Sequence, residues 1–157
     1  MALEVKHPSQ VAVAVTKAIV GEQGVGKPQL AEMLLREPLP FKLTIRMASR
    51  LPLPEETQQA PVDFVVFMFD ICNKHSYQST CDSATHLAVN YYLGKVCFVV
   101  TQLGNPYERT VDMDTVSELT NSYDSPKLFA NFCVSRANNP LDWSCILIIT
   151  SHHTSQN

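Results

Sequence analysis

The feature that most constrains this chain is a glycine-rich loop between an apolar segment and an amphipathic one. The loop reads Gly21-Glu-Gln-Gly24-Val-Gly26-Lys27-Pro28, with the glycine and lysine spacing of the phosphate loop that joins a strand to a helix in nucleoside triphosphatases. In such a loop, backbone N–H groups surround the phosphates and the lysine reaches the outer ones. The pattern predicts a strand, a tight turn and a helix.

Position 28 departs from that pattern. A working loop carries serine or threonine after the lysine, and the hydroxyl binds Mg²⁺. Pro28 has no hydroxyl, although its fixed φ suits the first turn of a helix. We therefore expect a degenerate loop that serves as a turn and binds no cofactor, with an exposed Lys27 whose replacement by alanine changes stability little. Weak anion binding by the loop stays open as an alternative. The residues concerned are Gly21, Gly24, Gly26, Lys27 and Pro28.

Composition bounds the class of protein. A chain of 157 residues with 45% apolar content is expected to form one domain over residues 1–150, followed by a flexible tail at 151–157. From Ser135 onward the pattern fits either a closing helix or a strand. The net charge of −3 comes without a block of lysine or arginine, so direct binding to nucleic acid is not expected.

Cysteine usage and hydropathy indicate the compartment. The five cysteines are odd in number and irregularly spaced, which fits a reducing environment such as the cytosol or nucleus. The start of the chain lacks the apolar core of a signal peptide, and no stretch approaches the ~20 apolar residues of a membrane span. We therefore expect a soluble, intracellular protein that contacts no membrane.

The hydrophobic pattern predicts five strands. Segments 11–20, 62–71 and 96–100 are apolar with little alternation, which indicates strands buried on both faces, as in a parallel sheet covered by helices. Segment 41–48 alternates between apolar and polar side chains, which is typical of an edge strand. Segment 128–134 is expected to be the last strand.

Helices are expected between these strands. The helix after the loop is amphipathic and stops at Pro38. A second helix is predicted over 80–93 and ends at Gly94, where a left-handed cap is easiest. A third is predicted over 115–123, because Thr115 begins a capping-box pattern. The alternation of strands and helices predicts a three-layer α/β domain with a mostly parallel sheet.

Several stretches between Leu51 and Val134 together resemble the centromere protein M family. They occur in the family's order and span about half of the chain: Arg50-Leu-Pro-Leu-Pro54, Val62-Asp-Phe-Val-Val-Phe67, Lys74-His-Ser-Tyr-Gln78, Leu93-Gly-Lys-Val-Cys-Phe98 and Tyr123-Asp-Ser-Pro126. The resemblance implies a small-GTPase-like fold of the phosphate-loop NTPase type that neither binds nor hydrolyses GTP. It also implies a structural role in the constitutive centromere-associated complex of the inner kinetochore, in the nucleus. The implied partners are centromere protein I and, in the same complex, centromere proteins H and K.

The residues independently favour an inactive domain. In a GTPase the strand before the base-binding loop ends in Asn-Lys-x-Asp, whereas here Thr101-Gln-Leu-Gly104 follows the strand and offers no carboxylate to guanine. The stretch 38–61 contains no Asp-x-x-Gly and leaves little room for two switch segments, so the switch regions are expected to be reduced. We therefore expect no catalytic residues, no bound nucleotide and no enzymatic activity.

Two alternatives use other chemistry. The first is a divergent nucleotide-binding switch or phosphoryl-transfer enzyme, in which Lys27 contacts phosphate and Asp70, at the end of an apolar strand, organises a metal. The second is a zinc site formed by cysteine and histidine side chains whose spacing matches no common zinc module, so that no metal is expected. Those side chains are Cys72, His75, Cys81 and His86.

Two short segments are candidates for partner binding. A helix cannot point three consecutive bulky side chains inward, so Tyr92 or Leu93 should lie near the surface if Tyr91 is buried. An exposed aromatic beside an aliphatic side chain is typical of an interface anchor, with partial burial as the alternative. The second candidate segment contributes Leu51 and Leu53.

Overall fold

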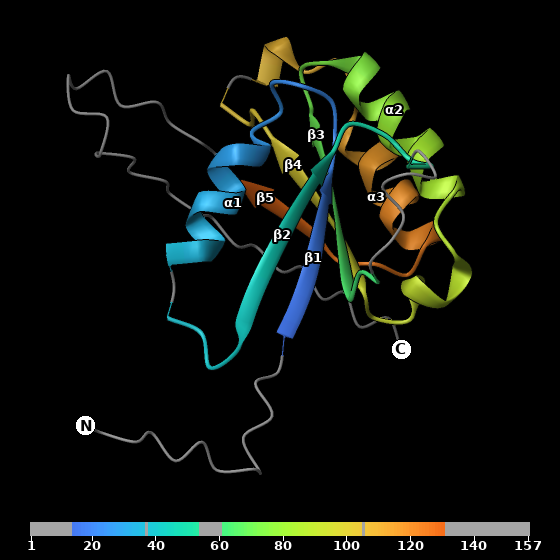
Figure 1. Cartoon of the computed structure of the whole chain (residues 1–157). Coiled ribbons are helices and arrows are strands. Elements are labelled where there is room, and N and C mark those ends of the chain that lie inside the picture. Colours follow the sequence, from blue (N-terminus) through green and yellow to red (C-terminus); the bar gives the residue numbers. More distant parts are fainter. Residues whose placement is uncertain (1–13, 37, 54–60, 105, 131–157) are drawn as a thin grey trace, which may run out of the picture.

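A computed structural model describes residues 14–36, 38–53, 61–104 and 106–130 of the chain (Figure 1). Five strands form one sheet in which every neighbouring pair is parallel, in the order β2-β1-β3-β4-β5. The strands are β1 (Ala14–Val20), β2 (Lys42–Ala48), β3 (Phe64–Asp70), β4 (Val96–Thr101) and β5 (Lys127–Ala130).

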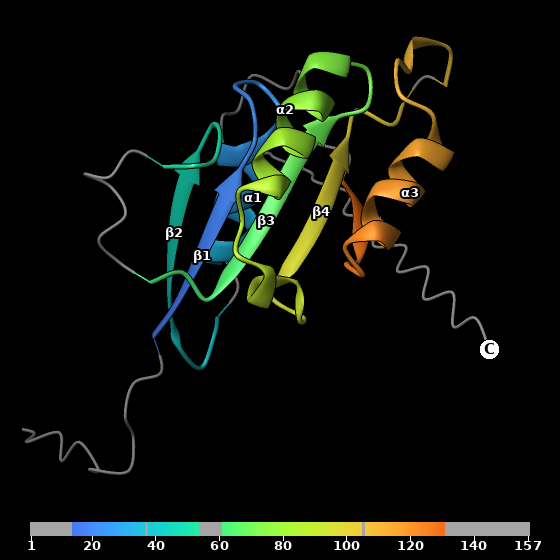
Figure 2. The same cartoon turned by 90° about the vertical axis from the view of Figure 1, so that its right-hand side faces the viewer.

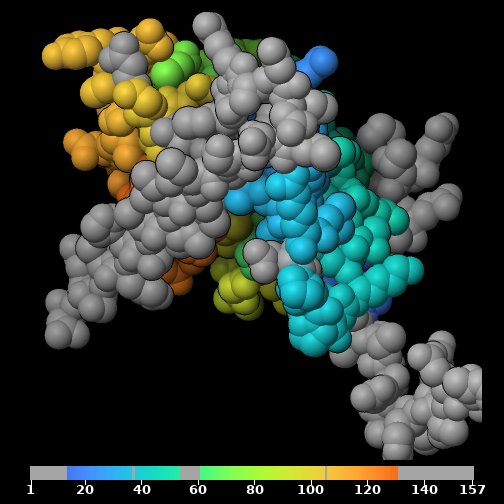
Figure 3. Space-filling view, turned by 90° about the vertical axis from the view of Figure 1, so that its left-hand side faces the viewer, coloured from blue at the N-terminus to red at the C-terminus, as the bar shows by residue number. Residues whose placement is uncertain are grey.

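Helices lie on both faces of this sheet. Figures 1 and 2 show α1 on one face and both α2 and α3 on the other. Figure 3 looks at the molecule from the side where α1 and β2 reach the surface. The helices are α1 (Lys27–Arg36), α2 (Lys74–Thr85) and α3 (Met113–Ser122), with short 3₁₀ helices η2 (Val89–Tyr92) and η3 (Pro106–Glu108). The three-layer α/β fold of small-GTPase type is thus confirmed.

The core has two parts because the central strands bury both of their faces. On β3, Val66 and Met68 face the α1 side, whereas Phe67 and Phe69 belong to the larger cluster on the α2 and α3 side. The Phe67 ring stacks on Phe98 of β4 at 5.3 Å. This two-sided burial explains why the central strands read as continuous apolar runs. The prediction of β2 as an edge strand is also confirmed.

The predicted helix over 80–93 is wrong in its bounds. The helix begins at Lys74, where Asn73 Oδ1 accepts a hydrogen bond from Ser76 N at 3.2 Å. Its buried positions are small hydroxyl residues and one alanine (Ser76, Ser79, Thr80, Ser83 and Ala84). Because most of these buried positions are polar, a search for apolar residues at helical spacing misses the first two turns of the helix. The chain leaves the helix after Thr85, becomes extended at Ala88, and forms η2 just before Gly94 at φ 87°.

Other predicted boundaries also differ. Helix α3 begins at Met113 with Asp112 as its N-cap residue, so Thr115 lies inside the helix and the predicted capping box is wrong. The first strand begins at Ala14 among the described residues, and positions 11–13 lie outside them. The last strand is described to Ala130. The rest of that predicted strand, the segment from Ser135 and the tail at 151–157 also lie outside the described residues.

Candidate functional site

The glycine-rich loop connects β1 to α1 at the carboxyl end of the sheet. Gly24 and Gly26 have φ values of 88° and 108°, a region that side chains with a Cβ adopt at a cost of about 1–2 kcal/mol. Leu30 N donates to the Gly26 carbonyl at 3.1 Å, which starts the helix. The predicted strand, tight turn and helix are therefore confirmed, and these two glycines are needed for the turn itself.

Gly21 is needed for a different reason, which is the close approach of two strands. A Cβ at this position would lie 2.5 Å from the Met68 carbonyl oxygen of β3. Val25, in the same loop, is 3% exposed and packs into the apolar cluster beneath α1. Gly21 and Val25 are thus part of the core, and packing explains both residues without any phosphate.

The Lys27 ammonium is bound by the backbone of its own loop. Its Nζ donates to the Gly21 carbonyl and lies 3.3 Å from the Ala48 carbonyl at the end of β2. Gly21 N also donates to the Ala48 carbonyl, at 3.0 Å. Burial lowers the pKa of Lys27, and the nearby Glu22 carboxylate opposes this shift. The expectation of an exposed Lys27 is therefore wrong: the side chain is partly buried and joins the loop to β2.

Glu22 ties the same loop to two further segments. Its Oε1 lies 3.0 Å from an Arg50 guanidinium nitrogen and 3.7 Å from His75 Nε2. The pKa of Glu22 is lowered by the Ser79 hydroxyl and by Arg50 and His75, against the effect of its burial. Because Arg50 follows β2 and His75 lies in the first turn of α2, this carboxylate fastens the loop to both.

Asp70 lies at the end of β3, as expected, but its carboxylate accepts a hydrogen bond within the turn that follows the strand. Asp70 Oδ1 accepts a hydrogen bond from Cys72 N at 2.7 Å. Its backbone N–H donates to Ser76 Oγ at 3.0 Å, which attaches the strand end to α2. Within the described residues, the hydrogen bonds and ion pairs of Lys27 and of Asp70 go to different partners and do not join the two side chains.

The segment 101–104, at the end of β4, is the one that sequence analysis compared with a base-binding motif. Thr101 is fully buried, and its Oγ1 donates to the Phe69 carbonyl at 3.3 Å. Gln102 has a φ of 63°. The Leu103 carbonyl accepts a hydrogen bond from Arg109 at 3.2 Å, and its side chain packs against the core. The segment is held by contacts within the domain and carries no carboxylate at 101–104.

The four side chains considered for zinc do not meet. Nowhere in the described ranges do three His, Cys, Asp or Glu side chains gather as a metal site would require. His75 pairs with Glu22, and His86 lines a pocket elsewhere. Burial raises the pKa of both the Cys72 and the Cys81 thiol, which favours the neutral thiol over the thiolate that binds metal.

Two of the proposed contact residues lie together but differ in exposure. The Tyr92 hydroxyl donates to the Ala84 carbonyl, its ring stacks on Tyr123 at 4.5 Å, and burial raises its pKa. Leu93 is 82% exposed, and Val89 at the start of η2 is 83% exposed. The sequence predicted that Tyr92 or Leu93 lies near the surface, and Leu93 is the one that does.

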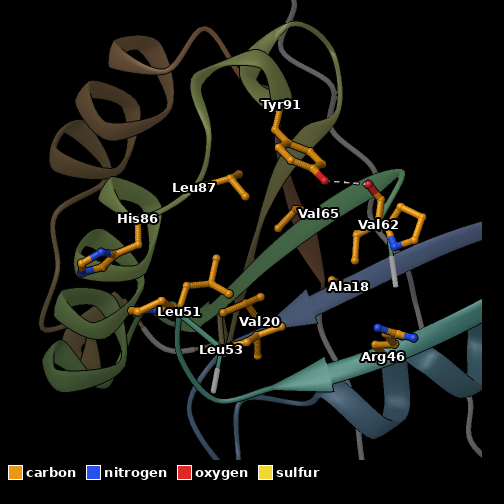
Figure 4. A pocket seen from close by; sticks show the side chains of 12 residues that line it. Ala18, Val20, Arg46, Leu51, Leu53, Val62, Val65, His86, Leu87 and Tyr91 are labelled. Carbon is orange, nitrogen blue, oxygen red and sulfur yellow. Dashed lines mark hydrogen bonds between the residues drawn. The ribbon is translucent and has the colours of Figure 1, made fainter. Parts of the chain in front are cut away.

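The other two, Leu51 and Leu53, line a pocket of about 380 Å³ on the α2 side of the sheet (Figure 4). Ala18, Val20 and Val65 of β1 and β3 also line it. The remaining walls come from β2, from the connection between β2 and β3, from the chain after α2 and from η2: Arg46, Pro52, Pro61, Val62, His86, Leu87 and Tyr91. Sequence reasoning missed this pocket, because its residues come from several separate segments and share no motif.

Sequence comparisons with known proteins find similar proteins of one family. A family model described as Centromere protein M (CENP-M) matches residues 6–149. Centromere protein M of Xenopus laevis is 39% identical over 116 residues, which cover 73% of this chain and 64% of that protein. The human protein of the same name is 33% identical over 116 residues, covering 74% and 64%. The chain therefore spans just under two thirds of the length of these relatives. No helix within the described ranges is long and apolar enough to cross a membrane.

Proposed function

The chain belongs to the centromere protein M family, and on this premise we propose that it is a catalytically inactive, GTPase-like structural subunit of the constitutive centromere-associated complex. Its place is the nucleus, at the centromere and kinetochore of chromosomes. Its partners are centromere protein I and, in the same complex, centromere proteins H and K. It stabilises centromere protein I and so supports kinetochore assembly and chromosome segregation.

The observation that carries the proposal is the state of Lys27. In a nucleotide-binding loop this ammonium must be available to phosphate oxygens, whereas here it bonds to the loop's own Gly21 carbonyl and faces that of Ala48. Pro28 supplies no hydroxyl for Mg²⁺. The alternative of a switch or phosphoryl-transfer enzyme using Lys27 and Asp70 is disfavoured, because both side chains are committed to backbone contacts.

The proposed unit is one domain over residues 1–150 with a tail at 151–157. All the described strands share one sheet, so this part offers no internal boundary. We place the partner contact on the side of η2 and of the segment after β2, where Leu93, Leu51 and Leu53 lie. Tyr92 supports that surface from beneath through its stacking on Tyr123.

The test is co-purification of the full chain with centromere protein I of the same species. Leu93→Glu should abolish co-purification, since a carboxylate without a partner in a desolvated interface costs several kcal/mol. At 82% exposure, the same change should leave folding of the free chain intact. Leu35→Glu is the matched control, because Leu35 is also an exposed leucine (58%) but belongs to α1 on the opposite face.

Two results would contradict the proposal. The first is a wild-type chain that does not bind centromere protein I. The second is a Leu93→Glu variant that keeps the wild-type circular dichroism spectrum and melting temperature and still co-purifies, which would move the interface away from η2.

A further inference from the structure

Ser125 is the only serine or threonine of this chain that directly precedes a proline. The chain has ten prolines, and the residues before the others carry no hydroxyl. A serine followed by proline is the substrate pattern of proline-directed protein kinases, which transfer a phosphoryl group from ATP to the serine hydroxyl. The proline also biases the backbone of the serine toward the extended region. The sequence therefore offers one position, Ser125-Pro126, to this class of kinase.

This position lies in the turn that connects α3 to β5. Asn121, Asp124 and Pro126 are exposed in and around the turn, and Ser125 is half-buried. The Ser125 hydroxyl donates to the Tyr123 carbonyl at 3.1 Å. Because this hydrogen bond is internal to the turn, a local opening of the turn is enough to free the hydroxyl.

The same turn completes the carboxyl end of α3. Ser125 N donates to the Thr120 carbonyl at 3.0 Å, and Asp124 N donates to the Asn121 carbonyl at 3.1 Å. Both carbonyls belong to the last turn of the helix, where the helix dipole is negative. A phosphate carries a charge of about −1.5 to −2 at pH 7, so at Ser125 it would be repelled by the helix end and by the adjacent Asp124 carboxylate. Phosphorylation should therefore weaken the turn.

The basic residue closest to Ser125 in the sequence is already engaged. It is Lys127 of β5, whose Nζ donates to Ser117 Oγ in the middle of α3. A phosphate can order a segment when it meets a free cation, and it disrupts a segment when it meets a helix carboxyl end or an acidic side chain. A phosphate at Ser125 would have to break the contact between Lys127 and Ser117 to gain a cation from this residue. The contacts around the turn therefore favour disruption.

Two stacked tyrosines join this turn to η2. The ring of Tyr123, directly after α3, stacks on the ring of Tyr92 in η2 at 4.5 Å. Tyr92 directly precedes Leu93, which is 82% exposed. Figure 2 shows the turn into β5 at the same end of the sheet as η2. A turn that loosens around Ser125 also loosens Tyr123, so a charge at Ser125 can change how firmly Leu93 is presented.

We propose that a proline-directed protein kinase phosphorylates Ser125 and that the phosphate weakens partner binding at η2. In this step the Ser125 oxygen bonds to the γ-phosphorus of ATP, and the bond from that phosphorus to the leaving oxygen of ADP breaks. The hydroxyl proton passes to the catalytic carboxylate of the kinase. The effect on binding rests on the function proposed above, because the partner is centromere protein I and the contact includes Leu93. The inference adds a modification site and a way to regulate that contact.

The first measurement is phosphate incorporation into the folded full chain by a purified proline-directed kinase with ATP, with the modified residue located by mass spectrometry. The wild-type chain should be phosphorylated at Ser125, and Ser125→Ala and Pro126→Ala should take up no phosphate. Ser122→Ala is the matched control, because Ser122 is an exposed serine at the end of α3 without a following proline. This variant should incorporate as much phosphate as the wild-type chain.

The second measurement compares the phosphorylated full chain with the unmodified one. The melting temperature should fall by several degrees, because the added charge opposes the end of α3. The dissociation constant for purified centromere protein I should rise at least fivefold. Ser125→Ala treated with the same kinase and ATP should keep the values of the untreated variant in both measurements.

The outcomes separate this inference from the proposed function. If the folded chain is not phosphorylated, or only at another residue, the inference is overturned and the proposed function is untouched. If Ser125 is phosphorylated but the melting temperature does not fall, or the dissociation constant is unchanged, the phosphate does not regulate the contact and the inference is again overturned alone. If the unmodified chain does not bind centromere protein I, the proposed function falls together with the effect on binding. Should Pro126→Ala fail to fold, Ser125→Ala decides the site.

Discussion

The phosphate loop and the pocket are both built on β1, and they differ in what they leave available. At the carboxyl end of the strand, the loop folds its lysine onto the Gly21 carbonyl and its Glu22 onto Arg50. On the α2 side of the sheet, the pocket keeps an apolar floor and an arginine without an ion-pair partner among the described residues. The glycine-rich loop matches a known motif, but its charged side chains are engaged in contacts within the domain. The pocket matches no motif.

The difference teaches that a loop with the spacing of a phosphate-binding motif can be explained by its structural contacts. The loop connects a strand to a helix, approaches β3 closely and joins β2 through Ala48. Each of these contacts selects residues that phosphate binding also selects. A glycine or lysine in this position is therefore weak support for nucleotide binding unless its hydrogen-bonding groups are free.

The first prediction, with the largest expected effect, tests whether packing explains Gly21. Gly21→Ala should lower the free energy of unfolding by about 2–4 kcal/mol, because the added methyl group would overlap a backbone carbonyl that cannot move independently of β3. The clash is with the Met68 carbonyl oxygen, which would lie 2.5 Å from the new Cβ. Urea unfolding followed by circular dichroism measures the change.

Two other glycines are the controls for this prediction. Gly24→Ala meets no atom within 4 Å but retains a φ of 88°, so it should cost only about 1–2 kcal/mol. Gly104→Ala meets no atom within 4 Å and should be close to neutral. If Gly21→Ala were as mild as Gly104→Ala, packing would not explain the glycine, and a ligand would be the better reason for it.

The second prediction concerns Lys27. Lys27→Ala should destabilise the folded chain by about 1–2 kcal/mol, because two partly buried carbonyl oxygens lose their ammonium partner. Thermal or urea unfolding without any ligand would measure it. Lys95→Ala, at an exposed lysine before β4, should change stability by less than about 0.5 kcal/mol. Equal stability of both variants would mean that the ammonium is not engaged with the loop.

The third prediction is a smaller, pH-dependent effect at Glu22. Its pKa in the folded chain lies below the ordinary 4.5, so its carboxylate stabilises the fold above that pH and loses this contribution as pH falls through the folded pKa. Glu22→Gln should cost about 0.5–1 kcal/mol at neutral pH, since its Arg50 partner is largely exposed. Unfolding measured near pH 7 and again near pH 3 should show the difference shrinking. A difference that stays constant would exclude a role for the charge.

Much of the fold could be predicted because it follows from contiguous patterns. Continuous apolar runs indicate strands buried on both faces, and β3 and β4 bear this out with nearly every side chain buried. The alternation in 41–48 indicates an edge strand, and β2 lies at the edge. The start of α2 could not be predicted in this way, because the residues that face the sheet are serine and threonine.

The candidate site was predictable only in part, for a related reason. Pro28 in the glycine-rich loop and the lack of a carboxylate at 101–104 are visible in short stretches of sequence. The partners of Lys27 are backbone carbonyls, and any residue can supply those, so no side-chain pattern reveals them. The pocket combines residues from Ala18 to Tyr91, and only the sheet topology brings them together.

The measurement that tests the central claim most directly is the melting temperature of the full chain with and without about 1 mM Mg²⁺-GTP or Mg²⁺-ATP, together with phosphate release. A ligand at 100 times its dissociation constant stabilises a fold by about 2.7 kcal/mol, which shifts the melting temperature by several degrees. A closed loop predicts no shift and no release with either nucleotide. A reproducible shift of several degrees that Lys27→Met abolishes would contradict the account, since it would show that the lysine leaves the loop to hold phosphate.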